Sequence, residues 1–181
     1  GNTTINGTFM KMTTNPGFII LMGVTGSGKT TMGTMLAEKL GWDFFDGDNY
    51  HSPENIRKMS EGIPLTDADR ADWLERLAAL ISDGLSKGKP GVMACSALKQ
   101  KYRDVLTVDP QKVRFVYLKG TPQQIRLRVQ NRLGHYMKAD MVESQFAALE
   151  EPFDALTIDI DRPPEESLNL ILKIFHLDKV R

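Results

Sequence analysis

The feature that most constrains the fold is the glycine-rich stretch at residues 23–30, which reads GVTGSGKT and matches the phosphate-binding pattern G-x-x-x-x-G-K-[ST]. It stands between an unbroken apolar run, Phe18–Met22, and a helix-compatible stretch, Lys29–Leu40. An unbroken apolar run is typical of a parallel strand that is covered on both faces. The sequence therefore predicts a strand, a phosphate-binding loop (P-loop) and a helix in succession, as in an α/β fold.

The glycines let successive backbone N–H groups turn inward around phosphate oxygens, and the helix N-terminus adds positive potential. We expect Lys29 to reach the β- and γ-phosphates of a nucleotide and Thr30 to offer its hydroxyl to Mg²⁺. An ordinary glycine-rich turn is the alternative, and the flanking strand and helix argue against it. The residues expected to bind the nucleotide here are Gly23, Val24, Thr25, Gly26, Ser27, Gly28, Lys29, Thr30 and Thr31.

Composition limits the class of partner. The 23 lysines and arginines balance the 23 aspartates and glutamates, so no net basic field attracts a nucleic acid or an anionic membrane. The single cysteine, Cys95, excludes an intrachain disulfide, and it is expected to be a buried, inert thiol. No secretory signal is recognisable in the first residues. We expect a cytoplasmic protein with no nucleic-acid or membrane partner.

Short apolar runs alternate with helical patterns, which predicts one layered domain. We expect residues 17–181 to form a single α/β domain with three layers around a five-stranded parallel sheet, and residues 1–16 to be a disordered tail or a remnant of processing or cloning. Thr66 is the expected N-cap of a helix whose apolar stripe begins at Trp73. The further strands are expected at Trp42–Phe45, Gly91–Cys95, Val113–Leu118 and Leu156–Ile160.

A short mobile lid is predicted around residues 133–145. Two helical patterns, Gln123–Leu133 and Ala139–Leu149, flank the interruption Gly134-His135-Tyr136. Such segments close over substrates in many enzymes.

Two carboxylates, Asp46 and Asp48, follow the second strand at its carboxyl end. Ligands of open α/β sheets bind outside the carboxyl ends of the strands, so both should lie near the P-loop. We expect Asp48 to act as the base that receives a hydroxyl proton and Asp46 to lie on the metal side. The reverse assignment and a simple solvated acidic turn remain open.

Thirteen short blocks spread from Ile20 to about Pro152 accompany the P-loop. They are Trp42–His51, Glu54–Asn55, Lys58–Met59, Gly62–Asp67, Asp69–Arg70, Trp73–Leu74, Cys95–Lys99, Tyr102–Asp104, Arg128, Arg132, Gly134–His135, Ser144–Phe146 and Leu149–Glu150. In combination, these blocks resemble the gluconokinase family of P-loop kinases. The resemblance implies an adenylate- or shikimate-kinase-like fold, ATP and Mg²⁺, phosphorylation of D-gluconate at its 6-hydroxyl, and a homodimer. The sequence departs from the common family pattern at Tyr136 and Thr25.

Gluconate carries one carboxylate and a row of hydroxyls, so its pocket needs at least one cation and several hydrogen-bonding groups. Lys99 and Arg103 lie four residues apart and could meet the sugar acid or a phosphate together. Surface ion pairs or ordinary solvation are the alternatives for these basic side chains. The candidates for substrate contact are Asp48, His51, Lys58, Arg70, Lys99, Arg103, His135 and Gln145.

Arg128 and Arg132 are also four residues apart and precede the lid. By analogy with related nucleotide kinases, we expect Arg128 near the adenine and Arg132 on the phosphates when the lid closes. Solvated helix arginines are the alternative. Pro163 is a candidate wall for the adenine. The expected catalytic residues are Lys29, Asp48 and Arg132.

Two other functions remain open from sequence. A shikimate- or nucleotide-type kinase would share the fold, because a P-loop names no acceptor. A nucleotide-dependent binding module would use the P-loop as a switch, but it leaves the carboxylate turn and the arginines before the lid without a role.

Overall fold

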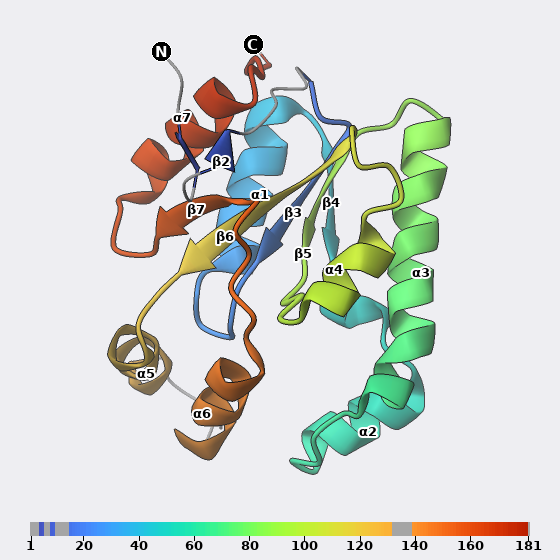
Figure 1. The fold of residues 1–181 in the computed structure, drawn as a ribbon, viewed down its shortest axis with the longest axis vertical. Coiled ribbons are helices and arrows are strands. Elements are labelled where there is room, and N and C mark those ends of the chain that lie inside the picture. The colour runs from blue at the N-terminus through green and yellow to red at the C-terminus, as the bar shows by residue number, and fades with distance from the viewer. Residues whose placement is uncertain (1–3, 6–7, 10–14, 132–138, 181) are drawn as a thin grey trace.

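The apolar run predicted as a strand, β3 (Phe18–Met22), is the central strand of a parallel sheet. The structure is a computed structural model that describes residues 4–5, 8–9, 15–131 and 139–180. Within them, five parallel strands pair in the order β4-β5-β3-β6-β7 (Figure 1). The predicted five-stranded parallel sheet is therefore confirmed. The other four strands are β4 Asp43–Asp46, β5 Gly91–Ala94, β6 Val113–Lys119 and β7 Leu156–Asp159.

The helices are α1 Lys29–Leu40, α2 Pro53–Ser60, α3 Asp67–Ser86, α4 Gln100–Leu106, α5 Pro122–Gln130, α6 Ala139–Ala148 and α7 Pro164–Ile174, with a 3₁₀ turn, η1, at Gly47–Tyr50. Within the described chain, none of them is both long and apolar enough to cross a bilayer. A two-residue antiparallel pair, β1 (Thr4–Ile5) with β2 (Thr8–Phe9), precedes the sheet.

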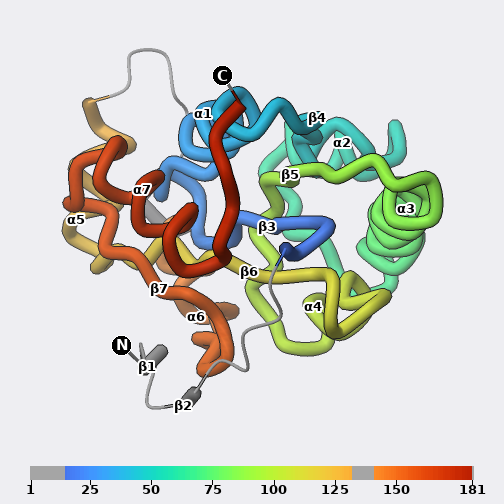
Figure 2. Tube along the Cα trace, turned by 90° about the horizontal axis from the view of Figure 1, so that it is seen from above, coloured from blue at the N-terminus to red at the C-terminus, as the bar shows by residue number. Residues whose placement is uncertain are grey.

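Helices cover both faces of the sheet because successive side chains of β3 enter two different apolar clusters. Ile19 and Leu21 pack in the cluster that holds the buried faces of α1 and α7. Ile20 and Met22 pack in the cluster that holds those of α3 and α4. Figure 2 shows these two pairs of helices on opposite sides of the strands. This arrangement confirms the predicted three-layer architecture.

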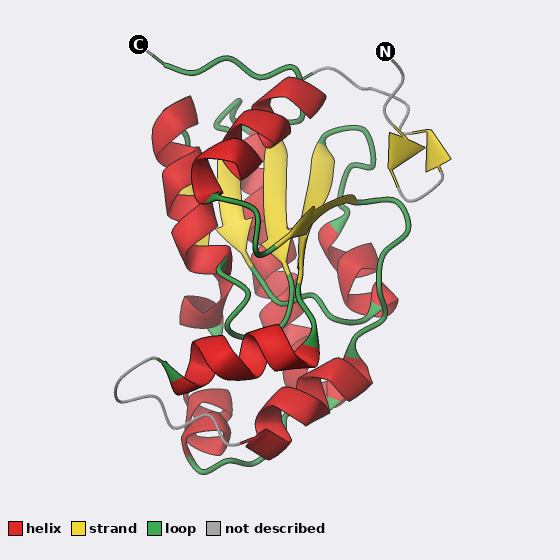
Figure 3. Ribbon diagram, turned by 90° about the vertical axis from the view of Figure 1, so that its left-hand side faces the viewer, coloured by secondary structure: helices red, strands yellow, loops and turns green. Residues whose placement is uncertain are grey.

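The helices α2, α5 and α6 lie beyond the carboxyl ends of the strands, at the lower end of the molecule in Figures 1 and 3. Connections that leave the carboxyl end of a parallel sheet are where α/β proteins place their ligands. The fold therefore collects the P-loop, the carboxylate turn and α6 at one end.

Element boundaries differ from the predicted ones by a few residues, for local reasons. The strand predicted from Trp42 starts at Asp43, because Trp42 N donates to Ala37 O and completes the C-terminal cap of α1. The helix predicted from Gln123 starts at Pro122, since Thr121 caps it and proline suits the first helical position. The helix predicted at Lys29–Leu40 has the predicted bounds.

A capping box fixes the start of α3. Thr66 Oγ1 accepts a hydrogen bond from Asp69 N at 3.1 Å, and Asp69 Oδ2 accepts one from Thr66 N at 2.9 Å. Each bond satisfies a backbone N–H that a helix end leaves without an intrahelical acceptor. The predicted N-cap is thus confirmed, and it sets the first turns of α3, which carry Arg70 and Trp73 toward the carboxyl edge.

We expect Thr66→Ala to lower the free energy of unfolding by about 1 kcal/mol, because it leaves Asp69 N without its acceptor. Thr66→Ser keeps the hydroxyl and is the matched control. Urea unfolding followed by circular dichroism measures both variants. Equal stability of the alanine and serine variants would contradict the role of the cap.

Candidate active site

A cavity of about 370 Å³ lies at the carboxyl ends of β3, β4 and β5. Ala94 of β5 pairs with Leu21 on one side and with Asp46 on the other, so the three strands end at one level. Two stretches that are separate in sequence, the P-loop and the carboxylate turn, therefore share a wall. The predicted site residues that line this cavity are Thr25, Lys29, Thr30, Asp46, Asp48, His51, Arg70 and Gln145.

The backbone of the P-loop calls for glycine. Gly28 has a φ of 96° and Gly23 a φ of 148°, values that other residues rarely adopt. A β-carbon on Gly23 would also lie 2.8 Å from Leu118 O and 2.8 Å from Ser27 Oγ. The loop is therefore pressed against the end of β6 with no room for a side chain.

Donors within the loop suit a chain of phosphates. The first N–H groups of α1, like those of any helix, have no intrahelical acceptor, and no side chain among the described residues caps them. Ser27 Oγ is buried and, among the described residues, has no hydrogen-bond partner. Lys29 Nζ spans the loop and donates to Gly23 O and Val24 O, each at 3.0 Å. A cation, an unpartnered hydroxyl and a helix N-terminus together fit an anion rich in oxygen.

Thr30 and Asp46, the predicted contacts of Mg²⁺, both line the cavity. The described residues contain no group of three or more His, Cys, Asp or Glu side chains that could hold a metal. Mg²⁺ does not need such a group beside phosphates, because it keeps several waters and is held by one or two carboxylates plus phosphate oxygens. The Thr30 hydroxyl at the end of the P-loop and the Asp46 carboxylate at the end of β4 line the same cavity and fit this ion.

The environment of Asp48 suits a general base. Asp46 Oδ1 accepts a hydrogen bond from Asp48 N at 3.0 Å, which fixes the turn between the two carboxylates. Asp48 is solvent-exposed overall and lines the cavity, where neighbouring protein atoms desolvate its carboxyl group. This desolvation and then the nearby Asp46 raise the pKa of Asp48, and Lys29 lowers it. A carboxylate with a raised pKa is a stronger proton acceptor once it is ionised.

His51 is held against the indole of Trp73. The two rings stack with centroids 4.2 Å apart and planes inclined by 15°. Trp73 Nε1 donates to Gly47 O at 2.8 Å, so the indole itself is fixed to the carboxylate turn. Burial, and then the charges of Arg70 and Arg76, lower the pKa of His51 to about 4. The imidazole is therefore neutral around pH 7.

Arg70 brings a cation to the cavity from the first turn of α3. Its Nη1 donates to Leu65 O at 2.7 Å and to Tyr102 Oη at 3.3 Å. Its guanidinium carbon lies 5.5 Å from the centroid of the Tyr102 ring. These contacts hold the side chain in place, and the hydrogen bonds among the described residues leave its Nε and Nη2 for an anion.

Gln145 joins α6 to the P-loop. Its Oε1 accepts from Thr25 N at 2.6 Å, and its Nε2 donates to Thr25 Oγ1 at 2.7 Å. The sequence predicts that Gln145 reads substrate hydroxyls, but its amide is engaged with the nucleotide loop. Thr25, which departs from the common family pattern, supplies both partners.

Three predicted substrate contacts do not line the cavity. Lys58 Nζ pairs with Asp69 Oδ1 at 2.9 Å, and Lys99 Nζ lies 3.6 Å from Asp67 Oδ1. Arg103 is only 3% exposed and donates to Ala97 O, Gln100 Oε1 and Glu150 O. Lys99 is the N-cap of α4, so the two side chains do not form the exposed basic pair that their spacing predicts.

On the nucleotide side, Arg128 lies over the P-loop, where its Nη1 donates to Ser27 O at 3.4 Å and its Nη2 to Ile160 O at 2.5 Å. Pro163 is exposed and precedes α7, and Thr31 is exposed in the first turn of α1. Two predicted residues, Arg132 and His135, lie outside the described residues.

The sequence prediction missed much of the cavity wall. The segment Gly62–Leu65 before Thr66 and the small polar side chains Ser96 and Ser144 complete it. Most of these residues stand within the blocks that resemble the gluconokinase family, and that resemblance was the signal that could have found them. Cys95, predicted to be inert, is buried, and burial raises the pKa of its thiol to about 12. The missed residues are Met59, Gly62, Ile63, Pro64, Leu65, Trp73, Ala94, Cys95, Ser96, Met141 and Ser144.

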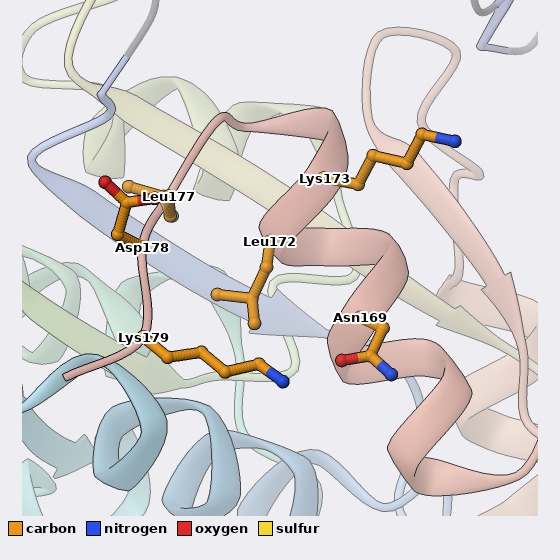
Figure 4. Close-up of a pocket in the computed structure, with 6 residues that line it drawn as sticks. All are labelled: Asn169, Leu172, Lys173, Leu177, Asp178 and Lys179. Atoms are coloured by element: carbon orange, nitrogen blue, oxygen red, sulfur yellow. The ribbon is translucent and has the colours of Figure 1, made fainter. Parts of the chain in front are cut away.

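A second and wider cavity, of about 740 Å³, lies beside α7 and the following chain segment (Figure 4). Its lining residues are Asn169, Leu172, Lys173, Leu177, Asp178 and Lys179. It is at the other end of the molecule from the P-loop and contains none of the predicted site residues.

Comparison with known proteins finds a kinase family model and several gluconokinase relatives. Residues 25–172 match the family model described as shikimate kinase. The gluconokinase of Gluconobacter oxydans (strain 621H) is 39% identical over 171 residues, covering 93% of this chain and 96% of the relative. The thermosensitive gluconokinase of Escherichia coli (strain K12) is 46% identical over 146 residues, covering 78% of each.

Solved structures give the same result. A gluconokinase from Sinorhizobium meliloti 1021 superposes with a TM-score of 0.79 at 41% identity, covering 90% of this chain and 93% of that one. A sugar kinase from Janibacter sp. HTCC2649 gives 0.82 at 41% identity, with 91% and 95% covered. The APS kinase CysC of Mycobacterium tuberculosis, at 19% identity and 0.70, shares the fold over 90% of this chain and 99% of that one.

We expect Asp48→Asn to lower kcat by at least about a hundredfold, the usual contribution of a positioned base. The wild-type rate should fall as the pH drops through the raised pKa of Asp48, and this acidic limb should be absent from the residual activity of the variant. Steady-state rates across pH measure both effects.

The same variant should not unfold. A raised pKa means that the folded state disfavours the ionised carboxylate, so its contribution to stability falls as the pH rises through that pKa. Asp48→Asn should therefore be at least as stable as the wild type at neutral pH. Wild-type turnover in a folded variant would refute the assignment of the base.

Proposed function

The chain belongs to the gluconokinase family of P-loop kinases, and we propose that it transfers the terminal phosphoryl group of ATP to the 6-hydroxyl of D-gluconate. The products are ADP and 6-phospho-D-gluconate. The observation that carries this proposal is that one cavity holds the P-loop, a carboxylate with a raised pKa and a fixed arginine. The site for the phosphate donor, the proton acceptor Asp48 and the carboxylate-binding Arg70 thus lie in the same cavity.

On the donor side, the backbone N–H groups of the P-loop and Ser27 Oγ bind the phosphates. Lys29 stabilises the charge that develops on the transferred group. Thr30 and Asp46 would hold Mg²⁺, which when bound neutralises charge between the β- and γ-phosphates. Arg128 helps to hold the nucleotide from its position over Ser27.

On the acceptor side, Arg70 binds the carboxylate of gluconate, because a guanidinium offers paired donors to a carboxylate. His51 meets a hydroxyl of the sugar acid. Asp48 takes the proton of the 6-hydroxyl as its oxygen forms the new bond to phosphorus. The bond from phosphorus to the bridging oxygen breaks, and that oxygen leaves as part of ADP.

Arg132 and His135 remain our candidates for the transition-state cation and for a further substrate contact. We also retain a cytoplasmic location, a homodimer, a lid around residues 133–145 and a single domain at 17–181 as parts of the proposal. Lys58, Lys99 and Arg103 have other partners in the structure, and we assign them supporting roles around Arg70 and α4.

The acceptor is tested with a panel of gluconate, other sugar acids, shikimate and nucleoside monophosphates in a coupled assay of ADP release. We expect gluconate to raise ADP release well above the background hydrolysis of ATP. Stimulation by shikimate or a nucleoside monophosphate alone would favour the related kinases. No stimulation by gluconate would reject the proposal.

We expect Arg70→Met to raise the KM for gluconate by about ten- to a hundredfold, as for the loss of a hydrogen bond to a charged group. The KM for ATP should change little. Arg76→Met is the matched control, since Arg76 lies on the same helix, is exposed and donates to Tyr50 O at 2.8 Å. Equal effects of the two substitutions would show that Arg70 does not bind the carboxylate.

A further inference from the structure

A buried amide lies against one edge of the His51 ring. Asn55 is 4% exposed and follows His51 by one helical turn, in α2. Its Nδ2 lies 2.8 Å from Asp69 O and 3.4 Å from His51 Nδ1. One NH₂ group therefore faces both a main-chain carbonyl and an imidazole nitrogen.

The orientation of this amide is decided by its partner. Asp69 O can only accept a hydrogen bond, so the atom that faces it must be the amide nitrogen. The reverse orientation would bring two oxygens together. The second N–H of Asn55 Nδ2 then points to His51 Nδ1, which must accept it and cannot carry a proton.

A neutral imidazole has one N–H, so a proton excluded from Nδ1 resides on Nε2. The ring face is covered by Trp73, and Nδ1 is covered by Asn55. The hydrogen bonds among the described residues leave Nε2 without a partner, although His51 lines the cavity. The edge that remains for a ligand is the one that bears the proton.

We infer that Asn55 holds His51 in the Nε2–H tautomer, so that His51 is a fixed hydrogen-bond donor to a hydroxyl oxygen of the acceptor. Asn55 is then a positioning residue, since it acts through His51. The identity of the acceptor rests on the proposed function, whereas the tautomer does not. An imidazole that carries its proton on Nε2 offers the substrate no lone pair on that nitrogen. It therefore does not compete with Asp48 for the proton of the substrate hydroxyl.

The charges around His51 favour the same state. Arg70 and Arg76 face it from α3, and together with burial they disfavour the imidazolium. Asp48 from η1 and Lys29 from the P-loop share the cavity. The neutral donor should therefore persist from weakly acidic to alkaline pH.

The direct test is long-range ¹H–¹⁵N correlation of the full-length enzyme with ¹⁵N-labelled histidine, without substrate. The chain has three histidines, so His51→Gln and His176→Asn assign the signals. His176 is exposed with a φ of 53°, which asparagine tolerates, and its variant should keep full activity. We expect His51 to show a protonated Nε2 and an unprotonated Nδ1. A protonated Nδ1 in the wild type would overturn the inference, with no variant needed.

Asn55→Asp reverses the polarity of the contact, because a carboxylate can only accept from Nδ1. The same spectra should show His51 protonated at Nδ1, or titrating near neutral pH. The KM for the acceptor should rise about tenfold, as for one lost hydrogen bond, with a smaller change in kcat. An unchanged tautomer in a folded Asn55→Asp enzyme would contradict the role of Asn55.

A pair of substitutions at His51 tests the donor itself. Glutamine places an N–H near the position of Nε2, whereas phenylalanine keeps the stacking on Trp73 and offers no donor. We expect His51→Phe to raise the acceptor KM about tenfold more than His51→Gln does. Equal KM values would refute the donor role. If gluconate proves not to be phosphorylated, the proposed function fails while the measured tautomer still decides this inference.

Discussion

The parallel register of β4, β5 and β3 is the constraint on which the site depends. Main-chain hydrogen bonds align Asp46 with Ala94 and Ala94 with Leu21, so the residues after each strand emerge at the same level. A shift of one residue in this ladder would turn the β4 side chains to the opposite face. The spacing between phosphate loop and carboxylates is therefore a property of the sheet.

The sequence predicted most accurately what local physics decides. The P-loop, the strand Phe18–Met22, the helix Lys29–Leu40 and the Thr66 cap each depend on neighbours in the chain, and all appear where their patterns place them. Arg70 follows the Thr66 cap, and Lys29 and Thr30 belong to the P-loop, so these site residues line the cavity as expected.

Side chains with distant partners could not be placed in this way. Helical spacing puts Lys99 and Arg103 on one face. It does not show that the buried guanidinium of Arg103 donates to Glu150 O and Ala97 O. Gln145 likewise finds Thr25, which is 120 residues away in sequence. A long polar side chain goes to whichever buried partner lies within reach, because an unsatisfied buried polar group costs about 1–3 kcal/mol. Which partner lies within reach depends on the tertiary structure, which helical spacing alone does not give.

The P-loop is continuous in sequence, but the residues that contact it in the fold are translated much later. Gly23 N donates to Ser96 O, Gly23 abuts Leu118 O, Arg128 reaches Ser27 O, and Gln145 holds Thr25. A nascent chain that has just left the ribosome with residues 23–30 thus carries the motif without its supports. Because domains fold as units, the phosphate site is completed only when translation has passed α6. The P-loop is therefore an early part of the sequence but a late part of the folded site.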